Sequence, residues 1–167
     1  MASTYEPIAS QTLGSAAASM TFSGIAASWT DLVLVAIGNN AAAGSLSNTL
    51  NIRLNSDTGS NYSVTAISGT GSSAVSGRDS NATEASIGGV GQASSSPGIG
   101  MAHIMSYANT NVYKTILGSY VVPSELLSKR VNLWRSTSAV TAITLFSSGG
   151  HNLAAGFTAS LYGIKAA

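Results

Sequence analysis

Two stretches of the sequence decide its fold class: Asp31-Leu-Val-Leu-Val-Ala-Ile37 and Thr49-Leu-Asn-Ile-Arg-Leu-Asn55. The second alternates strictly, with Leu50, Ile52 and Leu54 on one side and polar residues on the other. That alternation is typical of a strand with one buried face and one wet face. The first is a short, continuous apolar run, which indicates a central strand covered on both faces.

Similar runs recur along the chain at spacings of roughly 10–15 residues, with turn residues between them. The 18 glycines are so closely spaced that long helices are hard to place. We therefore predict an all-β fold, an antiparallel β-sandwich that is jelly-roll-like, with one short helical turn at Pro123–Lys129 at most. The other predicted strands are Tyr5–Ala9, Met20–Ile25, Tyr62–Ser68, Ala74–Arg78, His103–Tyr107, Tyr113–Val122, Arg130–Arg135, Ala142–Phe146 and Ala159–Ile164.

The length of 167 residues favours one domain, with or without an arm. Because the first twenty residues are rich in Ala and Ser, we predict an N-terminal arm plus first strand at 1–20 and a β-sandwich domain at 21–167. The glycine-rich stretch Gly88–Gly100 lacks periodicity, so it predicts a long loop that is mobile or ordered only against a partner.

The composition is unusual in its lack of charge. Only 8% of the residues are charged, against about 25% in a typical soluble domain, and the formal net charge is +1. Such a balance does not indicate binding to nucleic acid or to an anionic membrane. No apolar run approaches the roughly 20 residues that a membrane helix needs. The absence of cysteine excludes disulfides, thiolate zinc sites and cysteine nucleophiles.

The sequence shows no catalytic motif. The two histidines, His103 and His151, do not have metal-ligand spacing, and we interpret them as a strand residue and a turn residue. We predict no catalytic residues, no cofactor and no metal. A polysaccharide-cleaving enzyme is the least favoured hypothesis, because its two carboxylates would have to converge from distant positions. The six acids are Glu6, Asp31, Asp57, Asp79, Glu84 and Glu125.

Two segments allow a functional and a structural interpretation. Asn55–Asn61 loosely resembles a calcium loop, but it lacks the terminal bidentate acid, so we favour a hairpin turn at Asp57–Gly59. Trp134 is a candidate glycan contact because it shares a strand side with Asn132, which suggests the wetter side. A large aromatic in a small β-domain is nevertheless more often part of the core or of a subunit interface.

Several of these stretches together resemble a known group of proteins. The chain resembles small β-rich virion structural proteins of tailed bacteriophages, a loosely defined family of head-decoration (cement) proteins and tail-fibre or adhesin-like domains. The similarity runs from about Tyr5 to the end, and the family carries no catalytic residues that could be transferred here. Its motifs are Asp31-Leu-Val-Leu-Val35, Asn51-Ile-Arg-Leu-Asn55, Asp57-Thr-Gly-Ser-Asn-Tyr62, Val131-Asn-Leu-Trp-Arg-Ser-Thr137 and Leu161-Tyr-Gly-Ile-Lys-Ala-Ala167.

The resemblance implies a place in the virion. The leading expectation is a capsid decoration protein that forms a homotrimer on the outer head shell and binds the major capsid protein or another virion protein. The alternative is a tail-fibre or adhesin module that binds host-surface glycan through Trp134. The predicted partner contacts lie in the arm and in the glycine-rich stretch: Tyr5, Glu6, Pro7, Ile8, Leu13, Val90, Pro97 and Ile99.

Overall fold

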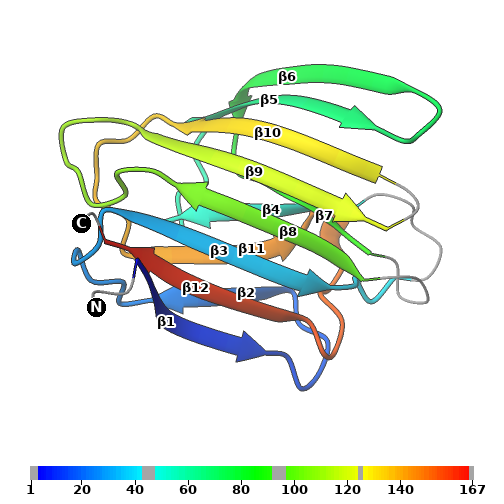
Figure 1. The fold of residues 1–167 in the computed structure, drawn as a ribbon, viewed down its shortest axis with the longest axis horizontal. Helices are drawn as coiled ribbons and strands as arrows, with labels where there is room; N and C mark the ends of the chain where they lie inside the picture. The colour runs from blue at the N-terminus through cyan, green and yellow to red at the C-terminus, as the bar shows by residue number, and fades with distance from the viewer. Residues whose placement is uncertain (1–3, 43–47, 92–96, 124–125, 166–167) are drawn as a thin grey trace.

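The computed structural model describes residues 4–42, 48–91, 97–123 and 126–165 as two packed antiparallel sheets (Figure 1). The larger sheet has the order β1-β12-β3-β8-β9-β10-β5-β6, and the smaller has the order β2-β11-β4-β7. Among the described residues, no helix is long and apolar enough to cross a membrane. The elements are β1 (Tyr5–Thr12), β2 (Ser19–Ser23), β3 (Asp31–Gly38), β4 (Asn48–Leu54), β5 (Tyr62–Gly69), β6 (Ala74–Ala82), β7 (Ala85–Val90), β8 (Gly98–Ile104), β9 (Lys114–Val122), β10 (Leu126–Trp134), β11 (Ala142–Ser147), a single 3₁₀ turn η1 (Ser148–Gly150) and β12 (Thr158–Ile164).

The strand pairing is nested in the manner of a jelly roll. β1 pairs with β12, β2 with β11, β3 with β8 and β4 with β7, so the first strands pair with the last. Two hairpins, β5–β6 and β9–β10, are inserted into this scheme and extend the larger sheet. The predicted all-β sandwich of jelly-roll type is therefore confirmed. β6 is the far edge strand, and nearly all of it is exposed.

The core forms between the sheets as the alternation predicts. Leu50, Ile52 and Leu54 of β4 are buried. In β3, Leu32, Leu34 and Ala36 also point into the core and are buried. The prediction that β3 is covered on both faces is correct at Val33, which is buried, but wrong at Ile37, which is 44% exposed. The outer side of this strand therefore carries apolar residues that the chain itself does not cover.

The helical turn predicted at Pro123–Lys129 is wrong. Leu126 and the residues that follow belong to β10, and Leu126 is the register partner of Val122 in β9. Cross-strand pairing, and not a helical turn, therefore fixes the part of this segment from Leu126 to Lys129. Ser124 and Glu125 lie outside the described residues. The predicted end of the preceding strand at Val122 is confirmed, and Pro123 follows it.

The loop predicted over Gly88–Gly100 is also wrong at both of its ends. β7 includes Gly88 and Gly89, and β8 begins at Gly98. A Cβ atom at Gly88 or Gly89 would lie 2.6 or 2.5 Å from an atom of Tyr120 in β9. These glycines are in a strand because β7 approaches β9 too closely for any side chain at these positions. Residues 92–96 of the stretch lie outside the described residues.

Candidate functional site

The most unusual surface is the side of the larger sheet that points away from the smaller sheet, which we call the outer face. Figure 1 looks onto this sheet, with the smaller sheet behind it. Eight large apolar side chains from five neighbouring strands lie on it, each 37–59% exposed. They are Ile37, Ile67, Ile99, Met101, Leu117, Val121, Leu127 and Val131.

The strand register makes these side chains neighbours. Ile37, Ile99, Val121 and Leu127 are successive partners across β3, β8, β9 and β10, and they form one apolar row. Leu117 is paired with Val131 four residues further along the same strands, beyond the polar pair Ser119–Lys129. Cross-strand partners on one face lie about 5 Å apart, so the members of each set are in contact. Between the two sets, Met101 and Ile67 flank the Ser119–Lys129 pair, so the apolar surface surrounds this polar pair.

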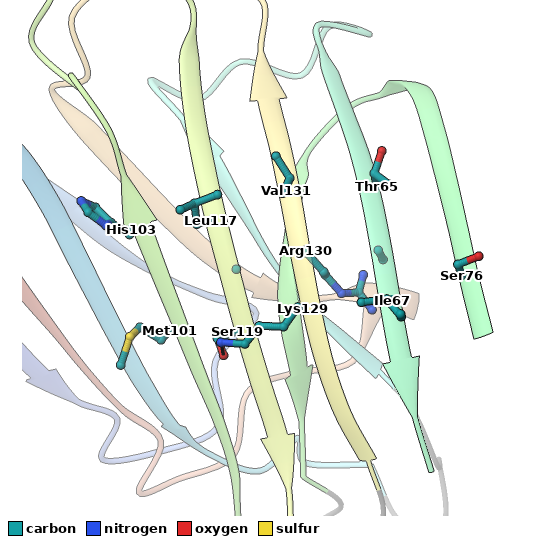
Figure 2. Close-up of a pocket in the computed structure, with 12 residues that line it drawn as sticks. Thr65, Ile67, Ser76, Met101, His103, Leu117, Ser119, Lys129, Arg130 and Val131 are labelled. Carbon is teal, nitrogen blue, oxygen red and sulfur yellow. Dashed lines mark hydrogen bonds between the residues drawn. The ribbon is translucent and has the colours of Figure 1, made fainter. Parts of the chain in front are cut away.

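A hollow of about 540 Å³ lies beside this row on the outer face. Figure 2 shows Met101, Ser119 and Lys129 lying across neighbouring strands, with Leu117 and Val131 beyond them. The lining is mostly apolar. A hollow of this kind suits an apolar side chain of a partner, because the surface that it exposes is mostly apolar although polar residues such as Ser119 and Lys129 border it.

Two of the charged side chains on the outer face, Lys129 and His103, have hydrogen-bond partners within the chain. Lys129 Nζ donates to Ser119 Oγ at 2.6 Å. His103 Nε2 lies 2.9 Å from Asp31 Oδ2, and Asp31 Oδ1 accepts a hydrogen bond from the Ser106 amide at 2.7 Å. The imidazole and the carboxyl therefore satisfy each other at the margin of the patch, and Lys129 lies along the sheet.

The eight side chains together expose roughly 700 Å², which exceeds the 300–600 Å² of the largest apolar patch on a typical monomer and approaches the ~800 Å² that each partner contributes to a standard interface. Among the described residues, no three His, Asp or Glu side chains gather to hold a metal ion. The chemistry that this surface offers is apolar contact.

The predicted partner contacts fall in two separate places. Tyr5, Glu6, Pro7 and Ile8 lie on β1, the edge strand opposite β6, and Leu13 follows it. Ile8 and Leu13 are partly buried against the core. The Glu6 carboxylate accepts hydrogen bonds from Lys165 Nζ at 2.9 Å and Trp29 Nε1 at 3.1 Å, and these two bonds lower the pKa of Glu6.

The second group comes from the glycine-rich stretch. Ile99 lies on the outer face, in the apolar row. Pro97 is exposed next to β8. Val90, by contrast, is buried in the core at the end of β7, so its prediction as a partner contact is wrong: a side chain packed between the sheets cannot reach a partner. β12 and β3 separate Ile99 from β1, so the two groups do not form one site.

Trp134 does not lie on the wetter side of its strand. It is 2% exposed, its ring stacks on Tyr62 with centroids 6.3 Å apart, and Nε1 donates to Asp57 Oδ2 at 2.7 Å. Asn132 is also fully buried, whereas Val131 is exposed, so the polar residue and the tryptophan point inward. The core interpretation of Trp134 is confirmed, and a buried indole cannot stack on a glycan.

The segment Asn55–Asn61 forms a turn, but not a hairpin. β4 and β5 belong to different sheets, so the turn carries the chain across the sandwich. Asn55 and Ser56 have positive φ values of 52° and 58°. Asp57 Oδ1 accepts from the Gly59 amide at 2.8 Å, and both carboxylate oxygens accept from Asn61 Nδ2. The carboxyl that a calcium ion would need is thus bonded to donors of the chain itself.

Most of the outer face could not be assigned from the sequence. In β9 the pairs Ile116-Leu117 and Val121-Val122 place one apolar side chain on each side of the strand. The sequence does contain one signal for this face. Two adjacent apolar residues in a strand indicate that both faces of that strand are covered. Comparison with known proteins adds no assignment, because neither a protein-family model nor a curated protein matches this chain.

Proposed function

We propose that this protein is a structural virion protein of a tailed bacteriophage, a capsid decoration protein that binds the outer head shell. The observation that carries the proposal is the apolar outer face of the larger sheet, because exposing it to water costs free energy unless another protein in an assembly, either the shell or a second copy of this chain, covers it. The motifs that resemble phage virion proteins lie in β3, β4, β10 and β12 and in the turn after β4. They therefore belong to the framework that presents this face.

The composition supports such a role. A decoration protein acts through many copies, so a moderate contact repeated around a shell gives a strong overall attachment. Contacts made by apolar side chains and neutral hydroxyls and amides lose little when salt screens charges. The formal net charge of +1 keeps mutual repulsion between neighbouring copies small.

We favour the decoration role over the tail-fibre or adhesin role. The adhesin role predicts an exposed aromatic side chain at Trp134, and that side chain is packed against Tyr62 in the core. The apolar outer face is a surface for protein, because glycan recognition needs convergent polar groups beside the aromatic ring.

Shell binding tests the proposal directly. Purified full-length protein is mixed with undecorated head shells, and the bound fraction is measured by cosedimentation. We expect saturable binding. Folded protein that never sediments with the shells would overturn the decoration role.

The β1 edge is the predicted shell contact, and two tyrosines allow a matched comparison. Tyr5 is 56% exposed on β1, and Tyr113 is 52% exposed before β9. We expect Tyr5→Ala to weaken shell binding about tenfold, the scale of a well-placed interface aromatic, and Tyr113→Ala to leave it unchanged. Equal effects of the two substitutions would contradict a shell contact at β1.

A further inference from the structure

We propose that a second copy of this chain covers the outer face, so that the protein self-associates through its larger sheet. The inference rests on the proposed structural role and names the partner that this face takes. The shell would then be met by another part of the molecule, such as the β1 edge. Four observations support self-association over a shell contact here.

The first observation is size. The exposed apolar side chains supply roughly 700 Å², close to the ~800 Å² that one partner contributes to a standard interface. Residues between and around them, such as Thr65 and Ser119, add polar area to the same face. A second copy that presents the same face therefore completes an interface of ordinary size, with no other surface required.

The second observation is charge. Interfaces between identical chains are more apolar than other interfaces, and their centres are poor in charged residues. At the centre of this face Lys129 is bonded to Ser119, and at the margin His103 is bonded to Asp31. The Ser119 hydroxyl does not neutralise Lys129, so a two-fold contact has to keep the two Lys129 ammonium groups apart, whereas the apolar residues around them meet no such repulsion.

The third observation is shape. The row formed by Ile37, Ile99, Val121 and Leu127 stands beside the hollow that Figure 2 shows. In a two-fold contact, each element of one copy meets a different element of the other, and the reverse contact occurs as well. The row of each copy can thus enter the hollow of its partner, with the two sheets packed face to face about 10 Å apart.

The fourth observation is the apolar run of β3. Continuous apolar strands normally have a layer on each face. In the single chain, Val33 is buried on the outer side, while Val35 is half-buried and Ile37 is exposed. Within one chain, the layer that should cover the outer side of β3 is incomplete. The larger sheet of a second copy would complete it.

Two valines make a matched test. Val131 is 52% exposed on the outer face, and Val75 is 60% exposed on β6. Val75 is paired with Ser68, whereas the outer-face residue Ile67 is paired with Ser76, so Val75 points to the opposite side of the sheet. We expect analytical ultracentrifugation to give an oligomer for the wild-type chain and for Val75→Asp. For Val131→Asp we expect a dissociation constant raised at least about a hundredfold, as for a charge placed in an interface centre.

A milder pair of variants keeps the test decisive if an aspartate disturbs folding. The chain has no cysteine, so Val131→Cys and Val75→Cys each introduce a unique thiol. We expect alkylation of the Val131→Cys thiol to slow as protein concentration rises, and alkylation of the Val75→Cys thiol to be independent of concentration. Equal behaviour of the two thiols, or a wild-type chain that stays monomeric at about 100 μM, a concentration at which even weak interfaces form, would overturn the inference.

Shell binding separates this inference from the proposed function. An oligomer that Val131→Asp dissociates, but that never binds shells, supports self-association and overturns the decoration role. A monomer that binds shells, and loses that binding with Val131→Asp but not with Val75→Asp, overturns self-association and supports the decoration role, because the shell itself would then cover the face.

Discussion

Lys114 illustrates how single polar residues are used in a protein with so few charges. Its side chain is fully buried, and Nζ donates to the carbonyl oxygens of Asn109, Val112 and Thr137 at 2.6, 2.7 and 3.2 Å. Burial lowers the pKa of this amine. The ammonium group thus joins the segment before β9 to the segment after β10. Asn132 has a similar role between the sheets, since its amide exchanges two 3.0 Å hydrogen bonds with the backbone of Ser86 in β7.

Replacing Lys114 with Met should destabilise the fold. The substitution keeps most of the aliphatic stem but leaves three carbonyls without their donor, so we expect a loss of about 2–3 kcal/mol in the free energy of unfolding. Chemical denaturation measures it. Lys165→Met is the control, because its exposed pair with Glu6 should contribute no more than about 1 kcal/mol. Losses of similar size in the two variants would contradict a structural role for the buried amine.

Asp57 should make stability depend on pH. Burial opposes ionisation of this carboxyl, but hydrogen bonds from Trp134, Asn61 and the Gly59 amide outweigh it and lower its pKa below the ordinary value of 3.8. A carboxyl with a lowered pKa stabilises the folded state above the unfolded-state value, and this contribution disappears as pH falls through the folded-state value.

The variant Asp57→Asn isolates that contribution. We expect it to be less stable than the wild type by about 1.5–3 kcal/mol at pH 7, the value of a hydrogen bond to a charged group. The difference between the two proteins should shrink steadily below pH 3.8. Thermal unfolding of both proteins at neutral and acidic pH is the measurement, and a difference that stays constant with pH would contradict the assignment.

At the scale of the element, the residue types in β7 are determined by the close approach of β9 and not by an alternation of apolar and polar residues in β7. Gly88 and Gly89 are buried because the Tyr120 side chain of β9 fills the space above them. At Gly88 the added carbon would meet the Tyr120 Cβ atom, and at Gly89 it would meet the end of the ring. The conflict at Gly88 involves the Cβ atom of Tyr120, which every residue except glycine has. The conflict at Gly89 involves only the phenol ring of Tyr120.

That difference predicts a selective rescue. Gly89→Ala and Gly88→Ala should each cost about 1–3 kcal/mol, the usual cost of overpacking. Combining either with Tyr120→Leu in a double-mutant cycle should recover most of the cost of Gly89→Ala, but not that of Gly88→Ala, because leucine keeps Cβ. Equal coupling in the two cycles, measured by denaturation, would contradict the geometry.

The elements also show how far the sequence could be interpreted. Strands with clear alternation, such as β4 and β12, were predicted nearly to their ends. β7 was missed, because close approach of another strand cannot be seen locally and glycine normally indicates a turn. The inward side of β10 was assigned wrongly, because Val131 made its side look like the core, while Asn132 is buried through partners 46 positions away.

At the scale of the whole molecule, the two outer surfaces differ. The outer side of the smaller sheet carries polar groups, including the Arg53–Glu84 ion pair and a contact of Arg53 with the Phe146 ring at 4.6 Å. The outer face of the larger sheet is apolar. The alternation of apolar and polar residues predicts the jelly-roll sandwich. It does not predict that one outer surface is polar and the other apolar, because that depends on which side of β9 and β10 faces outward.

This asymmetry predicts weak salt dependence of self-association. Since the proposed contact is made by apolar side chains, the association constant should change less than about threefold between about 50 and 500 mM NaCl, a range over which the Debye length falls from above about 10 Å to well below it. Sedimentation equilibrium at several salt concentrations measures it. A decrease of tenfold or more would indicate that ion pairs, and not the apolar row, hold the copies together.

The pairing of the first strand with the last also has a practical consequence. The Lys165 amide donates to the Thr4 carbonyl at 3.3 Å, so both ends of the described chain leave from the β1 edge, the edge farthest from β6 (Figure 1). A fluorophore or affinity tag fused at either end would therefore project from the rim of the sandwich. Such labels would leave the outer face uncovered, but they would lie beside the β1 edge, so they would report on the predicted shell contact.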